Sequence, residues 1–112
     1  MTTVMYTTTS DAVRVTNADA VENLLSEYYF KVEPTLENEY ISFYSDGRSN
    51  AAFKVYESSD QRNLVTLSFL ERLSEYLNKS FELRCVEVEG DAMTDVWKWT
   101  VSKNGNVSKI KV

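Results

Sequence analysis

A chain of 112 residues, 43% hydrophobic and 26% charged, has the composition of one ordinary folded domain over residues 1–112 rather than of a disordered segment. Its net charge of −5 argues against a nucleic-acid partner, because phosphates are bound by Lys and Arg. The lone cysteine excludes an intrachain disulfide and no apolar run is long enough to span a bilayer, so we expect a cytoplasmic protein with no membrane partner.

The first elements along the chain are a short strand and a helix. Residues 11–16 alternate apolar and polar side chains, which predicts a strand. Thr16 or Asn17 then offers a helix N-cap, and we expect the helix to end near Phe30. Its apolar face consists of residues at helical spacing: Val21, Leu24, Leu25, Tyr28 and Tyr29. Residues 33–39 form an acidic connection.

A central hairpin is predicted next. Residues 39–45 and residues 51–57 both alternate in polarity, and the segment 46–50 between them has the composition of a turn. One face of this hairpin carries four apolar residues that would pack on the helices: Ile41, Phe43, Phe53 and Val55. The opposite face carries Tyr40, Tyr44, Lys54 and Tyr56.

A second helix and a longer strand follow. Ser68 and Glu71 match a capping box, so we expect a helix to begin there. Its apolar face consists of Phe69, Leu70, Leu73, Tyr76 and Leu77. Residues 81–89 read as a strand, in which a change of phase predicts a bulge near Arg84 and Cys85.

The chain ends in a second hairpin. Asn104-Gly105 between alternating segments predicts a two-residue type I′ turn. That turn would place Trp99 opposite Ile110 on an apolar face, with Trp97 opposite Val112 and Val101 opposite Ser108. On the other face, Lys98 would lie opposite Lys111.

The resulting element order is βαββαβ followed by a β-hairpin. This order predicts an α+β, ferredoxin-like two-layer sandwich, with an antiparallel sheet, two helices on one face and an added C-terminal hairpin. The alternative is an α+β fold in which the last hairpin folds over the open face of the sheet.

The residues needed for common catalytic and metal sites are missing. The chain has no histidine and one cysteine, and no nucleophile elbow, Walker A loop or dinucleotide fingerprint, so we expect no enzyme, no cofactor and no metal. Four acids near Gly90 are either a weak cation site or a solvated turn, and the turn is the expected interpretation: Glu87, Glu89, Asp91 and Asp95. Cys85 is either reactive or, as expected for a strand cysteine, a small buried side chain.

The four residues Tyr40, Tyr44, Lys54 and Tyr56 are the candidate partner-binding site, because tyrosine is enriched in protein interfaces. The alternative is that the C-terminal hairpin covers these rings and makes them a second core layer.

Three functions remain open on the sequence. The preferred hypothesis is a small non-enzymatic protein-interaction, regulatory or inhibitory module whose partner is another protein. The second is a nucleic-acid-linked protein. It would be either an acidic mimic of nucleic acid or a weak binder of RNA or single-stranded DNA through tyrosines and the phosphate-contacting residues Lys98, Lys109 and Lys111. The third is a small-molecule binder or metal-free enzyme. A homodimer through an exposed sheet edge is compatible with each of them.

Overall fold

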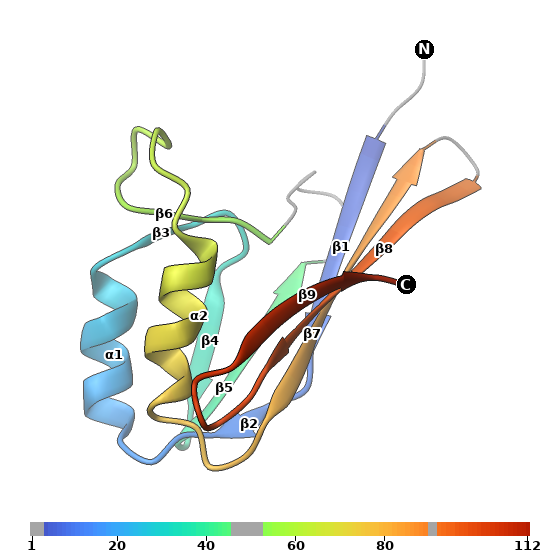
Figure 1. Ribbon diagram of the computed structural model, residues 1–112. Helices are drawn as coiled ribbons and strands as arrows, with labels where there is room; N and C mark the ends of the chain where they lie inside the picture. The colour runs from blue at the N-terminus through green and yellow to red at the C-terminus, as the bar shows by residue number, and fades with distance from the viewer. Residues whose placement is uncertain (1–3, 46–52, 90–91) are drawn as a thin grey trace.

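The computed structural model describes residues 4–45, 53–89 and 92–112, which form an α+β fold with two helices and mostly antiparallel strands (Figure 1). The helices are α1 (Ala18–Ser26) and α2 (Thr66–Ser74). The strands are β1 (Val4–Ser10), β2 (Val13–Arg14), β3 (Tyr29–Phe30), β4 (Pro34–Glu37), β5 (Tyr40–Ser45), β6 (Val55–Tyr56), β7 (Phe81–Glu89), β8 (Ala92–Val101) and β9 (Val107–Lys111). The predicted turn at 46–50 lies outside the described residues.

The main sheet has seven strands, and every pair of neighbouring strands in it is antiparallel. Its order is β4, β5, then β1 together with β2, then β7, β8 and β9. β1 and β2 pair with the same strand, because Thr8 lies opposite Ser45 and Val13 lies opposite Ile41. The register differs by one residue between these two pairs, so β1 and β2 behave as one strand with a bulge. Seven strands exceed the four of a ferredoxin-like core, and that finer topology is not confirmed.

The predicted pairing of residues 39–45 with residues 51–57 is wrong. β5 pairs with β4 on one side and with β1 and β2 on the other, whereas β6 pairs with β3 in a separate two-stranded sheet. The predicted burial is nevertheless confirmed: Ile41, Phe43, Phe53 and Val55 are all buried in one core. Phe43 and Phe53 reach each other across the core, with ring centroids 5.1 Å apart.

Two strands of the main sheet, β1 and β4, were not predicted. β1 is rich in threonine and lacks the alternation of apolar and polar residues by which strands are recognised. β4 lies in the segment predicted to be an acidic connection, and it forms a tight hairpin with β5. The two residues between them, Asn38 and Glu39, have φ values of 51° and 67°, and positive φ at both central residues is the mark of a type I′ turn.

A substitution at this turn tests its geometry. Glu39 adopts a left-handed conformation that favours glycine, and its carboxylate forms an exposed ion pair with Arg14 at 3.2 Å. Glu39→Gly and Glu39→Ala both lose that ion pair, so their difference isolates the backbone effect. We expect the Gly variant to be about 1 kcal/mol more stable than the Ala variant in urea denaturation. Equal stabilities would contradict a left-handed Glu39.

The helices begin and end where local hydrogen bonds dictate. The side chain of Asn17 accepts a hydrogen bond from the Ala20 N–H at 3.1 Å, which confirms it as the N-cap of α1. α1 ends at Ser26 rather than near Phe30, because Tyr29 and Phe30 pair with β6 instead. The predicted capping box is wrong: α2 starts at Thr66, so Ser68 and Glu71 lie inside the helix.

The core lies between the helices and one face of the sheet, which we call the inner face. Buried residues of both helices, among them Val21 and Phe69, join buried residues of β5, β7 and β8, among them Ile41, Leu83 and Val101, in one cluster. Figure 1 shows α1 and α2 side by side on this face, with β1, β7 and β8 reaching beyond them. The opposite face of the sheet, the outer face, carries neither α1 nor α2.

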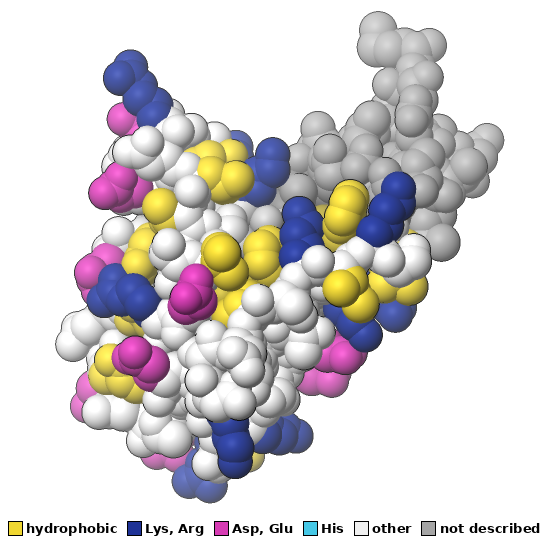
Figure 2. Space-filling view, viewed as in Figure 1, with side chains coloured by type: hydrophobic (Ala, Val, Ile, Leu, Met, Phe, Trp, Pro, Cys, Tyr) yellow, Lys and Arg dark blue, Asp and Glu magenta, His cyan; other side chains and the backbone are white. Residues whose placement is uncertain are grey.

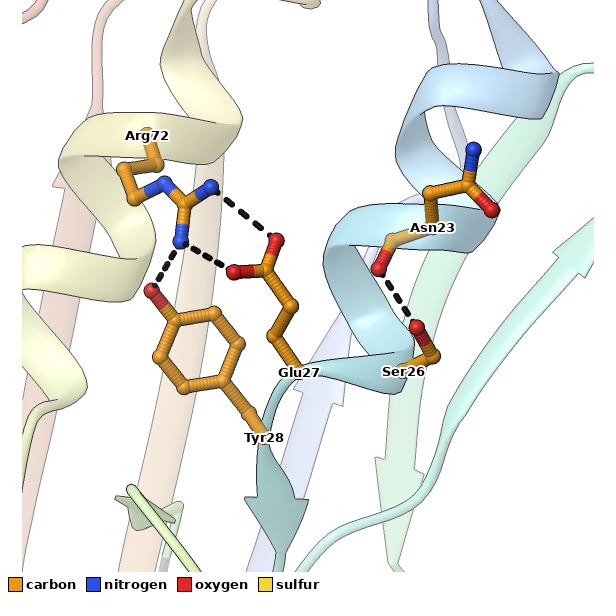
Figure 3. A network of polar contacts seen from close by, with 5 residues as sticks. All are labelled: Asn23, Ser26, Glu27, Tyr28 and Arg72. Atoms are coloured by element: carbon orange, nitrogen blue, oxygen red, sulfur yellow. Dashed lines mark hydrogen bonds and ion pairs between the residues drawn. The ribbon is translucent and has the colours of Figure 1, made fainter.

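One polar cluster joins the end of α1 to α2 (Figure 3). The guanidinium of Arg72 donates two hydrogen bonds to the Glu27 carboxylate, at 3.2 and 3.0 Å, and one to the Tyr28 hydroxyl at 2.7 Å. The hydrogen bonds to Glu27 raise the pKa of the Arg72 guanidinium above its usual value, and the hydrogen bond to Tyr28 adds a smaller effect in the same direction. Arg72 therefore links α2 to the end of α1 at the surface of the protein.

Candidate functional site

Two of the four predicted contact residues share the outer face. Tyr40 and Tyr44 lie on β5, where they alternate with the buried Ile41 and Phe43. Tyr40 is 46% exposed and Tyr44 is 66% exposed, so the C-terminal hairpin does not cover them. That hairpin lies at the far edge of the sheet, beyond β7. The two rings therefore belong to an accessible surface rather than to a second core layer.

The other two predicted residues lie elsewhere. Tyr56 is on β6, where it pairs with Tyr29 in the small sheet near the ends of the helices, and it is half-buried. Lys54 immediately precedes β6 and is exposed, and its backbone carbonyl accepts a hydrogen bond from the Lys31 N–H at 3.1 Å. The structure brings Tyr40 and Tyr44 onto one face and does not bring Lys54 and Tyr56 to it.

The C-terminal hairpin has a different register from the one predicted. Its loop contains three residues, Lys103 to Gly105, and only Gly105 has a positive φ, of 96°. This geometry is typical of a three-residue loop whose last residue is left-handed. Trp99 consequently lies opposite Lys109 rather than Ile110, a shift of one residue that reverses the face of every β9 side chain.

The shift creates a feature that the sequence did not predict, which we call the Trp–Lys surface and define as Trp97, Trp99, Lys109 and Lys111. The ammonium of Lys109 lies 4.7 Å from the Trp97 ring centroid and 5.3 Å from that of Trp99. The ammonium of Lys111 lies 5.7 Å from the Trp97 ring. All three distances are in the range of cation–π contacts. Figure 2 shows lysine and hydrophobic side chains next to each other over this hairpin.

Other charged groups are arranged as local surface pairs. On the outer face, Lys98 donates to the Glu82 carboxylate at 3.1 Å. In the turn before α2, the Ser58 hydroxyl and the Arg62 N–H donate to Asp60, and these two hydrogen bonds lower the pKa of its carboxyl group. Asp60 is exposed, so this cluster orders the turn rather than preparing a group for proton transfer.

The described residues include a polar hollow and a buried cysteine. They contain no group of three or more His, Cys, Asp or Glu side chains that could hold a metal ion. The side chains of the candidate cation site at Glu87, Glu89, Asp91 and Asp95 lie outside the description. Cys85 is buried on the inner face, as expected for a small apolar side chain. A hollow of about 550 Å³ between α2 and the β8–β9 loop is lined by polar residues such as Glu71, Arg72 and Lys103.

Comparisons with known proteins do not assign the chain to a class. No protein-family model matches it, no curated protein is significantly similar to it, and no solved structure matches it significantly. Within the described part of the chain, no helix is long and apolar enough to cross a membrane.

Proposed function

We propose that this chain is a small, non-enzymatic protein-interaction module that contacts its partner through the outer face of the sheet at Tyr40 and Tyr44. The observation that carries the proposal is the exposure of two tyrosines, 46% and 66%, four residues apart on one face of a strand in the interior of the sheet. Tyrosine offers a large, rigid contact area with a polar tip, and it is enriched at interfaces for that reason.

The surroundings of the two rings support a protein partner. In the neighbouring strands, Tyr40 lies opposite Arg14 and Glu37, and Tyr44 lies opposite Thr9. Aromatic residues bordered by polar and charged groups match the anatomy of a protein interface, which has a polar rim. As the scaffold of this face, we infer a ferredoxin-like core made of β7, β1 with β2, β5 and β4, which follow that fold's order and to which β8 and β9 are added.

The proposal is tested with a double variant. We expect Tyr40→Ala/Tyr44→Ala to raise the dissociation constant for the partner about tenfold or more, because exposed aromatic anchors dominate interface energies. The partner is first captured from native lysate in the presence of nuclease and then purified, so that affinity is measured with two defined components. The control is Tyr29→Ala, which removes a ring of 37% exposure outside the outer face.

Two results would refute the assignment. Unchanged affinity in the double variant with a native circular dichroism spectrum would show that these tyrosines do not contact the partner. Equal losses in the double variant and in Tyr29→Ala would show that the effect is not specific to the outer face.

The alternative of a single-stranded nucleic-acid binder has weaker support. The tryptophans of the C-terminal hairpin could stack on bases, but the Lys109 ammonium already lies against both Trp97 and Trp99. A stacking base has to displace that ammonium from the rings. The net charge of −5 also opposes binding to a polyanion. Salt-sensitive binding of single-stranded RNA that is lost in Trp97→Ala would reverse this preference.

A further inference from the structure

The strand β9 is an edge whose backbone is arranged to accept another strand. It is the last strand of the sheet, and among the described residues its ladder partner is β8. The Ser102 N–H donates to the Asn106 carbonyl and the Val112 N–H donates to the Val96 carbonyl, each at 2.8 Å. Because hydrogen-bonded and non-hydrogen-bonded pairs alternate along an antiparallel ladder, the backbone groups of Val107 and Lys109 point away from β8.

The charge of this edge is opposite to that of the rest of the chain. Residues 96–112 contain four lysines and no carboxylate, whereas all 17 acidic residues lie in residues 1–95 together with only eight basic residues. The lysine that lies centrally in β9, Lys109, projects on the inner face. On the outer face, Ile110 is 50% exposed, and Val112 just after the strand is 67% exposed. The edge is therefore cationic on one side and apolar on the other.

The side chains on the two sides of β9 indicate whether a second copy of the chain or a different protein would bind this edge. If two β9 strands paired antiparallel about their centres, Lys109 would lie directly opposite Lys109 of the second copy. Like charges opposite each other destabilise a strand pair. A strand with a carboxylate at that position would instead form an ion pair, and an apolar residue beside it would contact Ile110.

We propose that the β9 edge binds an extended segment of a partner protein in which acidic and apolar residues alternate, added to the sheet as a further antiparallel strand. Main-chain hydrogen bonds to Val107 and Lys109 supply the pairing, as in other cases of strand addition. The charge of Lys109 and the exposed Ile110 select the sequence. The β9 edge is distinct from the part of the outer face that carries Tyr40 and Tyr44. Each of the two binding proposals can therefore be refuted without the other.

A designed peptide tests the proposal on the full chain. The probe is a short, end-capped peptide of alternating Glu and Val, titrated into isotopically labelled protein and followed by NMR and amide hydrogen exchange. We expect slowed exchange at the Val107 and Lys109 amides, and affinity about tenfold lower for Lys109→Glu. The matched control Lys103→Glu makes the same charge change in the loop, outside the strand, and should have little effect. A peptide N-methylated at its Glu amides keeps its charge and should not bind, because the Glu opposite Lys109 has to direct its amide towards β9.

Several outcomes would overturn it. Failure of the Glu–Val peptide to bind, or binding without protection of the Val107 and Lys109 amides, would exclude strand addition at β9. Equal binding of a Lys–Val peptide would exclude selection for acidic residues. Tighter binding of a single-stranded oligonucleotide at the same residues would assign the edge to nucleic acid. A concentration-dependent dimer with protected β9 amides would assign it to a second copy.

Discussion

A Phe69→Ala variant is expected to lose about 3–5 kcal/mol of unfolding free energy, the usual cost of removing a buried aromatic ring. Phe69 is fully buried at the centre of the aromatic core. Its ring centroid lies 5.2 Å from that of Tyr28, 5.0 Å from that of Phe30 and 6.4 Å from that of Phe43. The ring therefore joins α2 to the end of α1, to β3 and to the main sheet, and its loss leaves a cavity where these elements meet.

Urea denaturation measures this loss, with Leu67→Ala as the control. Leu67 lies on the same helix but is 49% exposed, so its truncation should cost less than about 1 kcal/mol. If the two variants lost equal stability, Phe69 would not occupy the centre of the core.

The second large effect is expected for Thr66→Val, about 1–3 kcal/mol, because a buried backbone donor then loses its acceptor. The Thr66 hydroxyl, at the first residue of α2, accepts a hydrogen bond from the Val55 N–H at 3.1 Å. The Val65 N–H in turn donates to the Val55 carbonyl at 2.8 Å. These two bonds tie β6 to the beginning of the helix.

Amide exchange separates this effect from a general loss of stability. In Thr66→Val the Val55 amide should exchange by local opening, and therefore faster than it would through global unfolding alone. Amides of β7 should still exchange only through global unfolding. Thr35→Val makes the same change at an exposed position and should be nearly neutral. Unchanged exchange at Val55 in Thr66→Val would show that the hydroxyl is not its acceptor.

Local signals predicted the parts of the fold that local physics decides. Asn17 caps α1 because its side chain reaches the Ala20 N–H, an interaction within one turn that the residue type suggests. The burial of Ile41, Phe43, Phe53 and Val55 follows from alternation within each segment. Strand pairing was not predictable in the same way, because it depends on which distant segments complete each sheet.

The two turns show where local signals mislead. Asn104-Gly105 has the sequence preferred by two-residue turns, yet it belongs to a three-residue loop, while the two-residue turn with positive φ values occurs at Asn38-Glu39. In that turn β4 and β5 hold the two residues in place, and the Glu39 carbonyl accepts a hydrogen bond from the Val15 N–H at 2.8 Å. Tertiary contacts therefore outweigh the cost of a left-handed glutamate.

The sequence predicted only part of the candidate site, because spacing within one strand is local whereas strand pairing is not. Tyr40 and Tyr44 share the outer face because both lie on one strand, where spacing alone fixes the face. Lys54 and Tyr56 were assigned to that face through a hairpin that the structure does not contain. The Trp–Lys surface was missed because a one-residue error in loop length moves Lys109 to the opposite face of the predicted hairpin.

Side-chain oxidation footprinting of the protein with its purified partner most directly tests the claim that the outer face is the contact surface. Hydroxyl radicals modify exposed tyrosines, and peptides that contain Tyr40, Tyr44 or Tyr29 are compared by mass spectrometry in the free and bound states. We expect oxidation of Tyr40 and Tyr44 to fall in the complex and oxidation of Tyr29 to stay constant. If Tyr40 and Tyr44 are oxidised as fast in the complex as in the free protein, the partner binds elsewhere.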